Sequence, residues 1–336
     1  MRPKINIRHF LCAIVGAAFL ASLSACYYTQ AARGQFELMR KREPIAELIE
    51  SGDTPDALAD RLALVLEARQ FSIDDLHLPD NDSYRSYADL ERNYVIWNVF
   101  AAPEFSLQPK SWCFPVVGCV SYRGYFAEDD ARKEAMRLRQ DGFDVAVGGV
   151  AAYSTLGKFS DPILNTMMHW DNTNLVAVMF HELAHQLLYK KDDSAFNESF
   201  ATAVEEVGIE RWLASRDQAQ EFENYRDKRE LRNQLIEHMR LAREDLDELY
   251  SSPMDDATKR ERKHDRLLQL NQVLKREFES RGDETPGWVD EDLNNARLAS
   301  MNLYHGRLDE FRELFAQCNQ DIQCFYERAT VLSEES

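Results

Sequence analysis

Three residues whose types and spacing suit metal chemistry stand together in the run Phe180–His185, which reads Phe-His-Glu-Leu-Ala-His. His181 and His185 are four residues apart, so a helix would place both imidazoles on one face. There they could share one metal ion at roughly 2.0–2.1 Å from each nitrogen. Glu182 flanks the same face without being a ligand, which is the position of a base that takes a proton from water. The pattern predicts a zinc site that activates water.

The residues around this run favour a metal site over a chance occurrence of the pattern. Apolar residues 175–180 lead into the run, and Leu187 and Leu188 follow it. The helix should therefore be apolar on nearly all sides and buried. Buried imidazoles and carboxylates are costly unless a partner compensates them, and a cation does so directly.

A third ligand is expected from a second helix that begins near Ser194, after the polar turn 190–193. Running antiparallel to the first helix, it would bring Glu198 to the metal. Two His and one Glu leave a fourth position for water, as in catalytic zinc sites. The alternative is that Asn197 and Glu198 only cap the helix. Glu205, seven residues further on the same face, either orients a ligand from behind or is an ordinary salt-bridged carboxylate.

Together these residues resemble the gluzincin metallopeptidases, in which a Glu on a following helix completes the zinc site. The chain is more specifically similar to a family of bacterial lipoproteins described as aminopeptidases, from about Cys26 to the 320s. The segments that carry the resemblance are Tyr27–Gln30, Arg33–Gln35, Trp97–Val99, Trp112–Pro115, Tyr122–Phe126, Ala152–Gly157, His181–Gln186, Asn197–Ala201 and Leu293–Ala296. Lys158 departs from the pattern, where an aromatic residue is expected. The resemblance implies a one-zinc peptide hydrolase, an aminopeptidase, with Glu182 as its base.

The resemblance also implies a sheet before the metal helix, with an edge strand that holds extended substrate by backbone hydrogen bonds. Residues 151–156 are the expected strand. Tyr153, Ser154 and Tyr304 are the candidate substrate-binding residues, and either tyrosine would donate to the oxyanion. A half-buried strand tyrosine that only packs is the alternative for Tyr153. The group that would grip a free amine is not located by spacing, so aminopeptidase and endopeptidase action both stay open.

The predicted fold class is α+β and mainly α. Runs of β-branched and aromatic residues at 94–101, 120–126 and 145–150 predict a small mixed sheet in the N-terminal part, after an amphipathic helix at 55–70. Charged residues dominate 218–281, and apolar residues recur there at spacings of three and four, which predicts a long antiparallel helical hairpin. The hairpin is either a solvated structural arm or a surface for a protein partner. The recurring positions are Leu231, Leu235, His238, Ala242, Leu246 and Leu249, followed by Leu267, Leu270, Leu274 and Phe278.

Four segments follow from these patterns. They are a signal peptide at 1–25, a zincin-like catalytic core at 26–217, the charged hairpin at 218–281, and a C-terminal helical part at 282–336 that packs on the core. In the last segment, Asn294 and Asn295 either bind extended peptide or cap a helix.

The N-terminus indicates a lipid-anchored envelope protein. A basic stretch is followed by the apolar run 10–20, and Leu23–Cys26 has the pattern at which bacterial lipoprotein precursors are cut and acylated. The alternative is an ordinary secreted protein in which Cys26 is incidental. Tyr27 after the cysteine is typical of sorting to the outer membrane, facing the periplasm.

The net charge of the chain limits the classes of partner that it can bind. The chain has 40 Lys and Arg against 58 Asp and Glu, a net charge of −18. Removal of residues 1–25 takes away three positive charges and no negative ones, which gives −21. Such an acidic protein is a poor binder of nucleic acid and of anionic lipid head groups.

Cysteine usage agrees with an oxidising compartment. Cys12 leaves with the signal peptide and Cys26 is the lipidation site. The remaining thiols are Cys113, Cys119, Cys318 and Cys324, whose spacings favour two local disulfides, although three connectivities are open. A second zinc site made from these thiols is the alternative.

These observations predict a zinc-dependent peptide hydrolase anchored in the bacterial envelope, with peptide as substrate and no nucleic-acid partner. The rival hypothesis is a non-catalytic lipoprotein, braced by zinc, that acts through its hairpin as an interaction module. A closed metal coordination shell would favour this rival.

Overall fold

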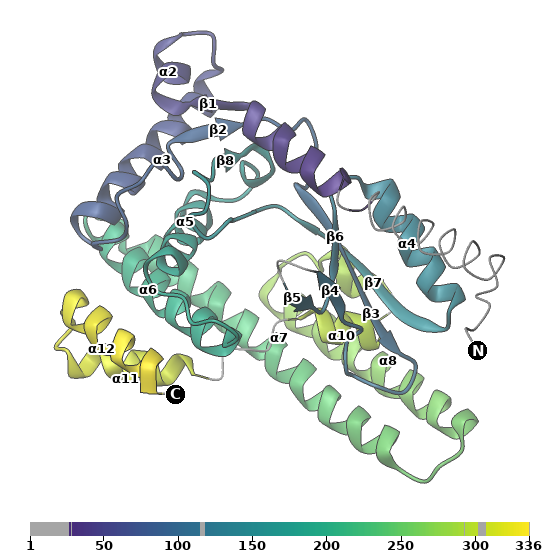
Figure 1. Ribbon diagram of the computed structural model, residues 1–336. Coiled ribbons are helices and arrows are strands. Elements are labelled where there is room, and N and C mark those ends of the chain that lie inside the picture. The colour runs from purple at the N-terminus through teal and green to yellow at the C-terminus, as the bar shows by residue number, and fades with distance from the viewer. Residues whose placement is uncertain (1–26, 28, 115–117, 292, 302–306, 336) are drawn as a thin grey trace, which may run out of the picture.

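Helices dominate the computed structural model (Figure 1), which describes residues 27, 29–114, 118–291, 293–301 and 307–335. Residues 29–40 are helical. The further helices are α2 (Ile45–Glu50), α3 (Asp56–Asp74), α4 (Glu128–Gln140), the short 3-10 helix η1 (Asn165–Met167), α5 (Asn172–Leu187), α6 (Ser194–Ala214), α7 (Ala219–Ser251), α8 (Asp256–Arg281), α9 (Gly287–Asp290), α10 (Asn295–Ser300), α11 (Leu308–Gln317) and α12 (Ile322–Glu335). Among the described residues, no helix combines the length and apolarity needed to cross a membrane.

The strands form three small sheets. They are β1 (Arg42–Pro44), β2 (Ser86–Ala88), β3 (Ile96–Pro103), β4 (Trp112–Phe114), β5 (Gly118–Val120), β6 (Arg123–Tyr125), β7 (Phe143–Val150) and β8 (Ile163–Leu164). One sheet has the order β1-β2-β8 and is mixed, because β2 pairs antiparallel with β1 and parallel with β8. A second sheet has the order β6-β3-β7 and is antiparallel, and β4 and β5 form a hairpin. The mainly helical α+β fold with early mixed sheets is as the sequence predicts.

The β6-β3-β7 sheet has two differently covered faces. Alternate residues of a strand point to opposite faces. Val99 and Ala101 of β3 pack with Ala131 and Leu138 of α4 on one side. The even-numbered residues face the other side, where Ala102 packs against Ala296 of α10. The same face continues toward α5 (Asn172–Leu187) and forms one wall of a cleft.

Residues 151–156 do not form the expected edge strand, and that prediction is wrong. The strand β7 ends at Val150, and residues 151–156 contain no strand. The backbone there bonds to side chains instead of to a neighbouring strand: the Ala151 carbonyl accepts from Thr166, and the Thr155 amide donates to Asp161 at 2.8 Å. Leu156 has φ 54°, a left-handed conformation that ends any extended run.

The helices α5 and α6 form the second wall of the cleft. Asp171 caps α5 by accepting from the Asn174 amide at 2.8 Å, and Asp193 caps α6 by accepting from the Phe196 amide at 2.9 Å. The connection 188–193 returns the chain, so α6 packs back along α5, and the apolar faces of both helices join the main core.

The charged segment forms the predicted hairpin of α7 and α8 (Figure 1). Eight of the ten recurring positions are buried in its seam, whereas Leu249 is only partly buried and the His238 side chain is 34% exposed. Asp255 caps α8, and Gly282 ends it in the left-handed conformation at φ 76° that favours glycine. Leu107 and Val289 extend the same apolar cluster onto neighbouring segments. The proposed domain boundaries stay a prediction.

The hairpin is also tied to the β6-β3-β7 sheet by charged contacts. Lys263 of α8 donates to Asp144 of β7 at 2.6 Å and to the Glu104 carbonyl at 2.8 Å.

Asn295 is fully buried and donates to backbone carbonyls next to β3, and Asn294 caps α10. Both asparagines are therefore structural in this fold.

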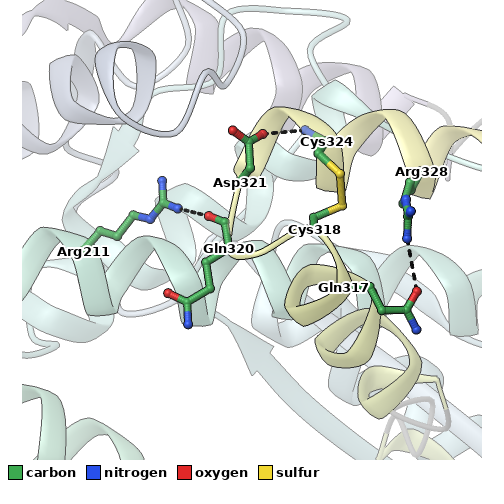
Figure 2. Close-up of a disulfide and its surroundings, with 7 residues drawn as sticks. All are labelled: Arg211, Gln317, Cys318, Gln320, Asp321, Cys324 and Arg328. Atoms are coloured by element: carbon green, nitrogen blue, oxygen red, sulfur yellow. Dashed lines mark hydrogen bonds between the residues drawn. A yellow bond between two sulfur atoms is a disulfide. The ribbon is translucent and has the colours of Figure 1, made fainter.

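The C-terminal helices α11 and α12 pack beside α6 (Figure 1). Phe311 and Phe325 meet Phe196 and Phe200 in an aromatic cluster. Figure 2 shows the disulfide that joins the two helices, with the Gln320 carbonyl accepting from Arg211 of α6 at 2.6 Å. The second disulfide closes the β4-β5 hairpin. The pairs are Cys113–Cys119 and Cys318–Cys324, the local pairing that the spacings favour, which leaves no thiol for the alternative zinc site.

Candidate metal centre

Two histidines of α5 and one glutamate of α6 converge on one point. Nε2 of His181 lies 3.1 Å from Nε2 of His185 and 3.4 Å from Oε2 of Glu198. The distance from His185 Nε2 to Glu198 Oε1 is 3.7 Å. Ligand atoms of a tetrahedral zinc ion, each at ~2.0–2.1 Å from the metal, are about 3.4 Å apart. The three side chains therefore have the spacing and the donor types to hold a metal ion, and they are the one such cluster within the described residues.

Local structure fixes the register of this cluster. The two histidines are one turn apart on α5, between buried residues such as Phe180 and Ala184. On α6, the buried Asn197 side chain accepts from the Lys190 amide and donates to the Lys190 carbonyl, both at 2.7 Å. Asn197 thus locks the turn before α6, and Glu198 is left to face the histidines.

The electrostatic surroundings of the two histidines differ. Burial lowers the pKa of His181, but the hydrogen bonds with Glu198 and Glu205 outweigh it and raise the pKa to about 10. Burial and the neighbouring His181 lower the pKa of His185 to about 4. The carboxylates around His181 favour a cation there, and His185 is neutral, which is the form that binds metal.

Glu182 lies beside the cluster on the wall of the cleft. Burial raises the pKa of its carboxyl group above the usual value, and a hydrogen bond from Ser154 works against that rise. The Ser154 hydroxyl is in turn hydrogen-bonded to the fully buried Tyr84 phenol, and it lies 3.4 Å from Asp161. A buried carboxylate with a raised pKa is suited to taking and returning protons near neutral pH.

Glu205 stands behind His181, on the side away from the cluster. Its Oε2 lies 3.0 Å from His181 Nδ1. An ionised carboxylate can only accept, so Nδ1 donates to it, and Nε2 is directed at the cluster. Its Oε1 accepts from Tyr225 at 2.7 Å and from Arg229 at 2.8 Å. Burial raises the pKa of Glu205, but the interaction with His181 and the charge of Arg229 outweigh it, so the net direction is down.

A cleft of about 770 Å³ opens onto this cluster, between the metal helices and the β6-β3-β7 sheet. Among the described lining residues, the only charged carboxylates are Glu182 and Glu198, and none is Lys or Arg. Tyr153 and Ser154 line it, as a substrate-binding role requires. Tyr304 and Cys26 lie outside the described residues. The remaining wall is largely aromatic and aliphatic, with Tyr27, Ile96, Val120, Tyr122, Phe126, Val150, Leu156 and Tyr189.

The N-terminal helical segment covers the outer edge of β6. The Gln30 side chain donates to the Gly124 carbonyl at 3.3 Å and accepts from the Phe126 amide at 3.1 Å. Gly34 permits this packing, since a Cβ there would lie 2.0 Å from the Phe126 ring. The sheet edge at these positions is therefore satisfied within the chain.

Sequence reasoning did not find several residues of the site. Tyr84 and Asp161 come from loops distant in sequence, and Tyr225 and Arg229 lie inside the charged hairpin. Tyr225 alone had a signal, because it is an aromatic residue amid charged neighbours and is buried. The others are recognisable only from the contacts between elements.

Comparison with known proteins gives one finding. The chain matches a family model described as "Putative aminopeptidase" over residues 26–336. No curated protein and no solved structure matches it. Because the match spans nearly the whole chain and includes the converging His, His and Glu, the protein belongs to this aminopeptidase family.

Proposed function

We propose that the protein is a zinc-dependent peptide hydrolase. The observation that carries the proposal is the arrangement of His181, His185 and Glu198 at tetrahedral spacing, with Glu182 on the wall of the same cleft. Glu198 keeps 32% of its side chain exposed, so the cluster opens toward the cleft instead of being sealed. An open face distinguishes a catalytic site from one that only braces helices.

Each side chain of the site has a separate role in the proposed reaction. When bound by the two histidines and Glu198, zinc would acidify water and polarise a peptide carbonyl. Glu182 takes the proton of the attacking water and returns it to the leaving amine, a role that its raised pKa supports. Glu205 holds His181 in the tautomer that presents Nε2. Tyr153, on the cleft wall, is the candidate donor to the oxyanion.

The substrate is a peptide, and the family description favours removal of N-terminal residues. The apolar, aromatic wall suits substrates with large apolar side chains beside the scissile bond. Acidic side chains would be repelled, because no described lining residue carries a positive charge to pair with them. Turnover of matched peptides with free and N-acetylated termini distinguishes the two modes: an aminopeptidase hydrolyses only the free form.

The proposed location is the periplasmic face of the outer membrane, with the anchor on Cys26. The pattern Leu23–Cys26 and the preceding apolar run support it. In a bacterial host, Cys26→Ser should abolish labelling by radioactive palmitate and move the protein from the membrane to the soluble fraction. Labelling that persists would reject the anchor.

Glu182→Gln is the decisive test of catalysis. The substitution keeps the shape of the side chain but removes the base, so peptide hydrolysis should fall by about 10²–10⁴-fold. The zinc content of the purified variant should stay at one per chain, since Glu182 is not a ligand. A variant that keeps full activity, or a wild-type protein that binds no zinc, would reject the proposed function.

A further inference from the structure

The N-terminal part of α7 is connected to the metal centre through one carboxylate. Glu205 of α6 uses one oxygen for His181 and the other for Tyr225 and Arg229 of α7. The carboxylate and its three partners are buried or nearly so: the side chains of Glu205, His181 and Arg229 are 13%, 16% and 15% exposed, and Tyr225 is buried. Water therefore does little to stabilise the orientation of the carboxylate, and the two α7 donors carry that role.

We infer that Tyr225 and Arg229 are positioning residues of the metal centre, so that the hairpin completes the site instead of being an appendage. The inference rests on the proposed metal centre. A carboxylate that accepts two hydrogen bonds at Oε1 is fixed in its plane, with Oε2 directed at His181 Nδ1. Nδ1 must then carry the proton, and Nε2 keeps its lone pair for the metal.

Arg229 has a second task that Tyr225 does not share. Its Nε lies 3.2 Å from Glu206, and Glu206 also pairs with Arg312 of α11 at 2.8 Å. Arg229 thus compensates two adjacent carboxylates of α6, and removing its charge would leave Glu205 buried without a cation. Arg229 variants therefore affect stability as well as metal binding, whereas Tyr225→Phe removes a single hydroxyl and no charge.

The rival explanation is that these contacts only dock the hairpin on α6. The chain offers a matched control for each residue, at the opposite end of α7. The Tyr250 hydroxyl donates to Asn295 at 2.7 Å, and Arg243 donates to the Leu298 carbonyl at 3.0 Å. Both controls dock the hairpin on α10, and neither contacts Glu205. Tyr250→Phe and Arg243→Lys therefore measure the effect of loosened docking alone.

The test measures zinc affinity in the full-length chain by competition with a chromophoric chelator. Tyr225→Phe and Arg229→Lys should weaken zinc binding by about tenfold or more, within the range for residues that orient a ligand. Tyr250→Phe and Arg243→Lys should bind zinc as the wild type does. In the cobalt-substituted protein, Tyr225→Phe should change the visible absorption bands, because a reoriented His181 alters the ligand field, whereas Tyr250→Phe should leave them unchanged.

Each other outcome is decisive. Equal zinc affinity in wild type, Tyr225→Phe and Arg229→Lys would overturn the inference while leaving the proposed function standing. Equal losses in Tyr225→Phe and Tyr250→Phe would also overturn it, because the effect would then come from docking. A wild-type protein that binds neither zinc nor cobalt would overturn both the inference and the proposed function.

Discussion

At the scale of single residues, the two histidines of α5 are held by different means. His181 is oriented by a carboxylate behind it, whereas Nδ1 of His185 is buried and has no hydrogen-bond partner among the described residues. Packing, including the neighbouring Tyr189 ring, therefore keeps His185 in place. Polar contacts therefore fix the orientation of His181, and packing fixes the orientation of His185.

The hydroxyl of Ser154 offers a test of how the base is tuned. Ser154→Ala removes a hydrogen bond that lowers the pKa of Glu182, so this pKa should rise further. The base is then protonated over a wider range, and the acid limb of the pH profile of kcat/KM should move to higher pH. A hydrogen bond to a charged group is worth about 1.5 kcal/mol, so activity on this limb should drop roughly tenfold. An unchanged limb would show that Ser154 does not act on Glu182.

At the scale of elements, α6 is the helix on which the site depends most. It contributes Glu198 and Glu205, and it packs against α5, α7 and α11. Its glycine, Gly208, lies where α6 meets Phe180 of α5. Close approach at this point requires a residue without a side chain.

Gly208→Ala should therefore destabilise the protein. In a helix the change gains about 1 kcal/mol of propensity. The added Cβ would lie 2.8 Å from the Phe180 ring and 2.9 Å from Leu76, both fully buried. Such overpacking costs about 1–3 kcal/mol, so a net loss of roughly 1 kcal/mol is expected in urea unfolding. Gly287→Ala is the control, since nothing lies within 4 Å of its added Cβ. Equal stability of both variants would contradict the packing argument.

The N-terminal cap of α5 predicts a pH-dependent contribution to stability. Burial raises the pKa of Asp171, but the Lys228 ammonium and the Asn174 amide outweigh it and lower the pKa below its usual value. A carboxylate with a lowered folded-state pKa stabilises above its unfolded pKa of about 3.9, and the contribution is lost as the pH falls through the folded value. Asp171→Ala should cost about 1 kcal/mol at pH 7 and nearly nothing at strongly acidic pH. Urea unfolding at both pH values checks this, and a loss that persists in acid would point to packing instead.

Much of this site could be predicted from sequence because its parts are local. His181, Glu182 and His185 lie within a single helical turn, and Glu198 follows after one short connection. The seam of the hairpin is likewise visible as a period of three and four. The strand expected at residues 151–156 followed from the family resemblance and was wrong, because the sequence does not reveal that Thr155 bonds to Asp161. Tyr225 stood out only as an aromatic residue amid charged neighbours and Arg229 not at all, because their contacts with Glu205 depend on how α7 packs on α6.

At the scale of the whole molecule, the disulfides join residues that are close in sequence, and non-covalent contacts join the distant segments. Both disulfides close short loops, each with a sequence separation of 6. The Cys318–Cys324 bond holds α11 and α12 together (Figure 2), and these helices back the face of α6 that contains Phe196 and Phe200. These two aromatic residues flank Glu198 in sequence.

Cys318→Ser combined with Cys324→Ser should lower the free energy of unfolding by about 2 kcal/mol, the entropy expected for a loop of this length. Added reductant should lower the thermal midpoint of the wild type more than that of the double variant, which retains only the Cys113–Cys119 bond. Calorimetry with and without reductant provides the measurement. A double variant as stable as the wild type would mean that aromatic packing alone holds the C-terminal pair.

The hairpin has one further consequence, for how substrates are admitted. It is attached to the helical wall of the cleft at Arg229 and to the sheet wall at Lys263. Two long helices that share a buried apolar seam make a stiff connection, so we expect the two walls to keep their spacing when a peptide binds. For the peptide hydrolase proposed above, we therefore expect extended peptides to enter the cleft and bulky folded chains to be excluded.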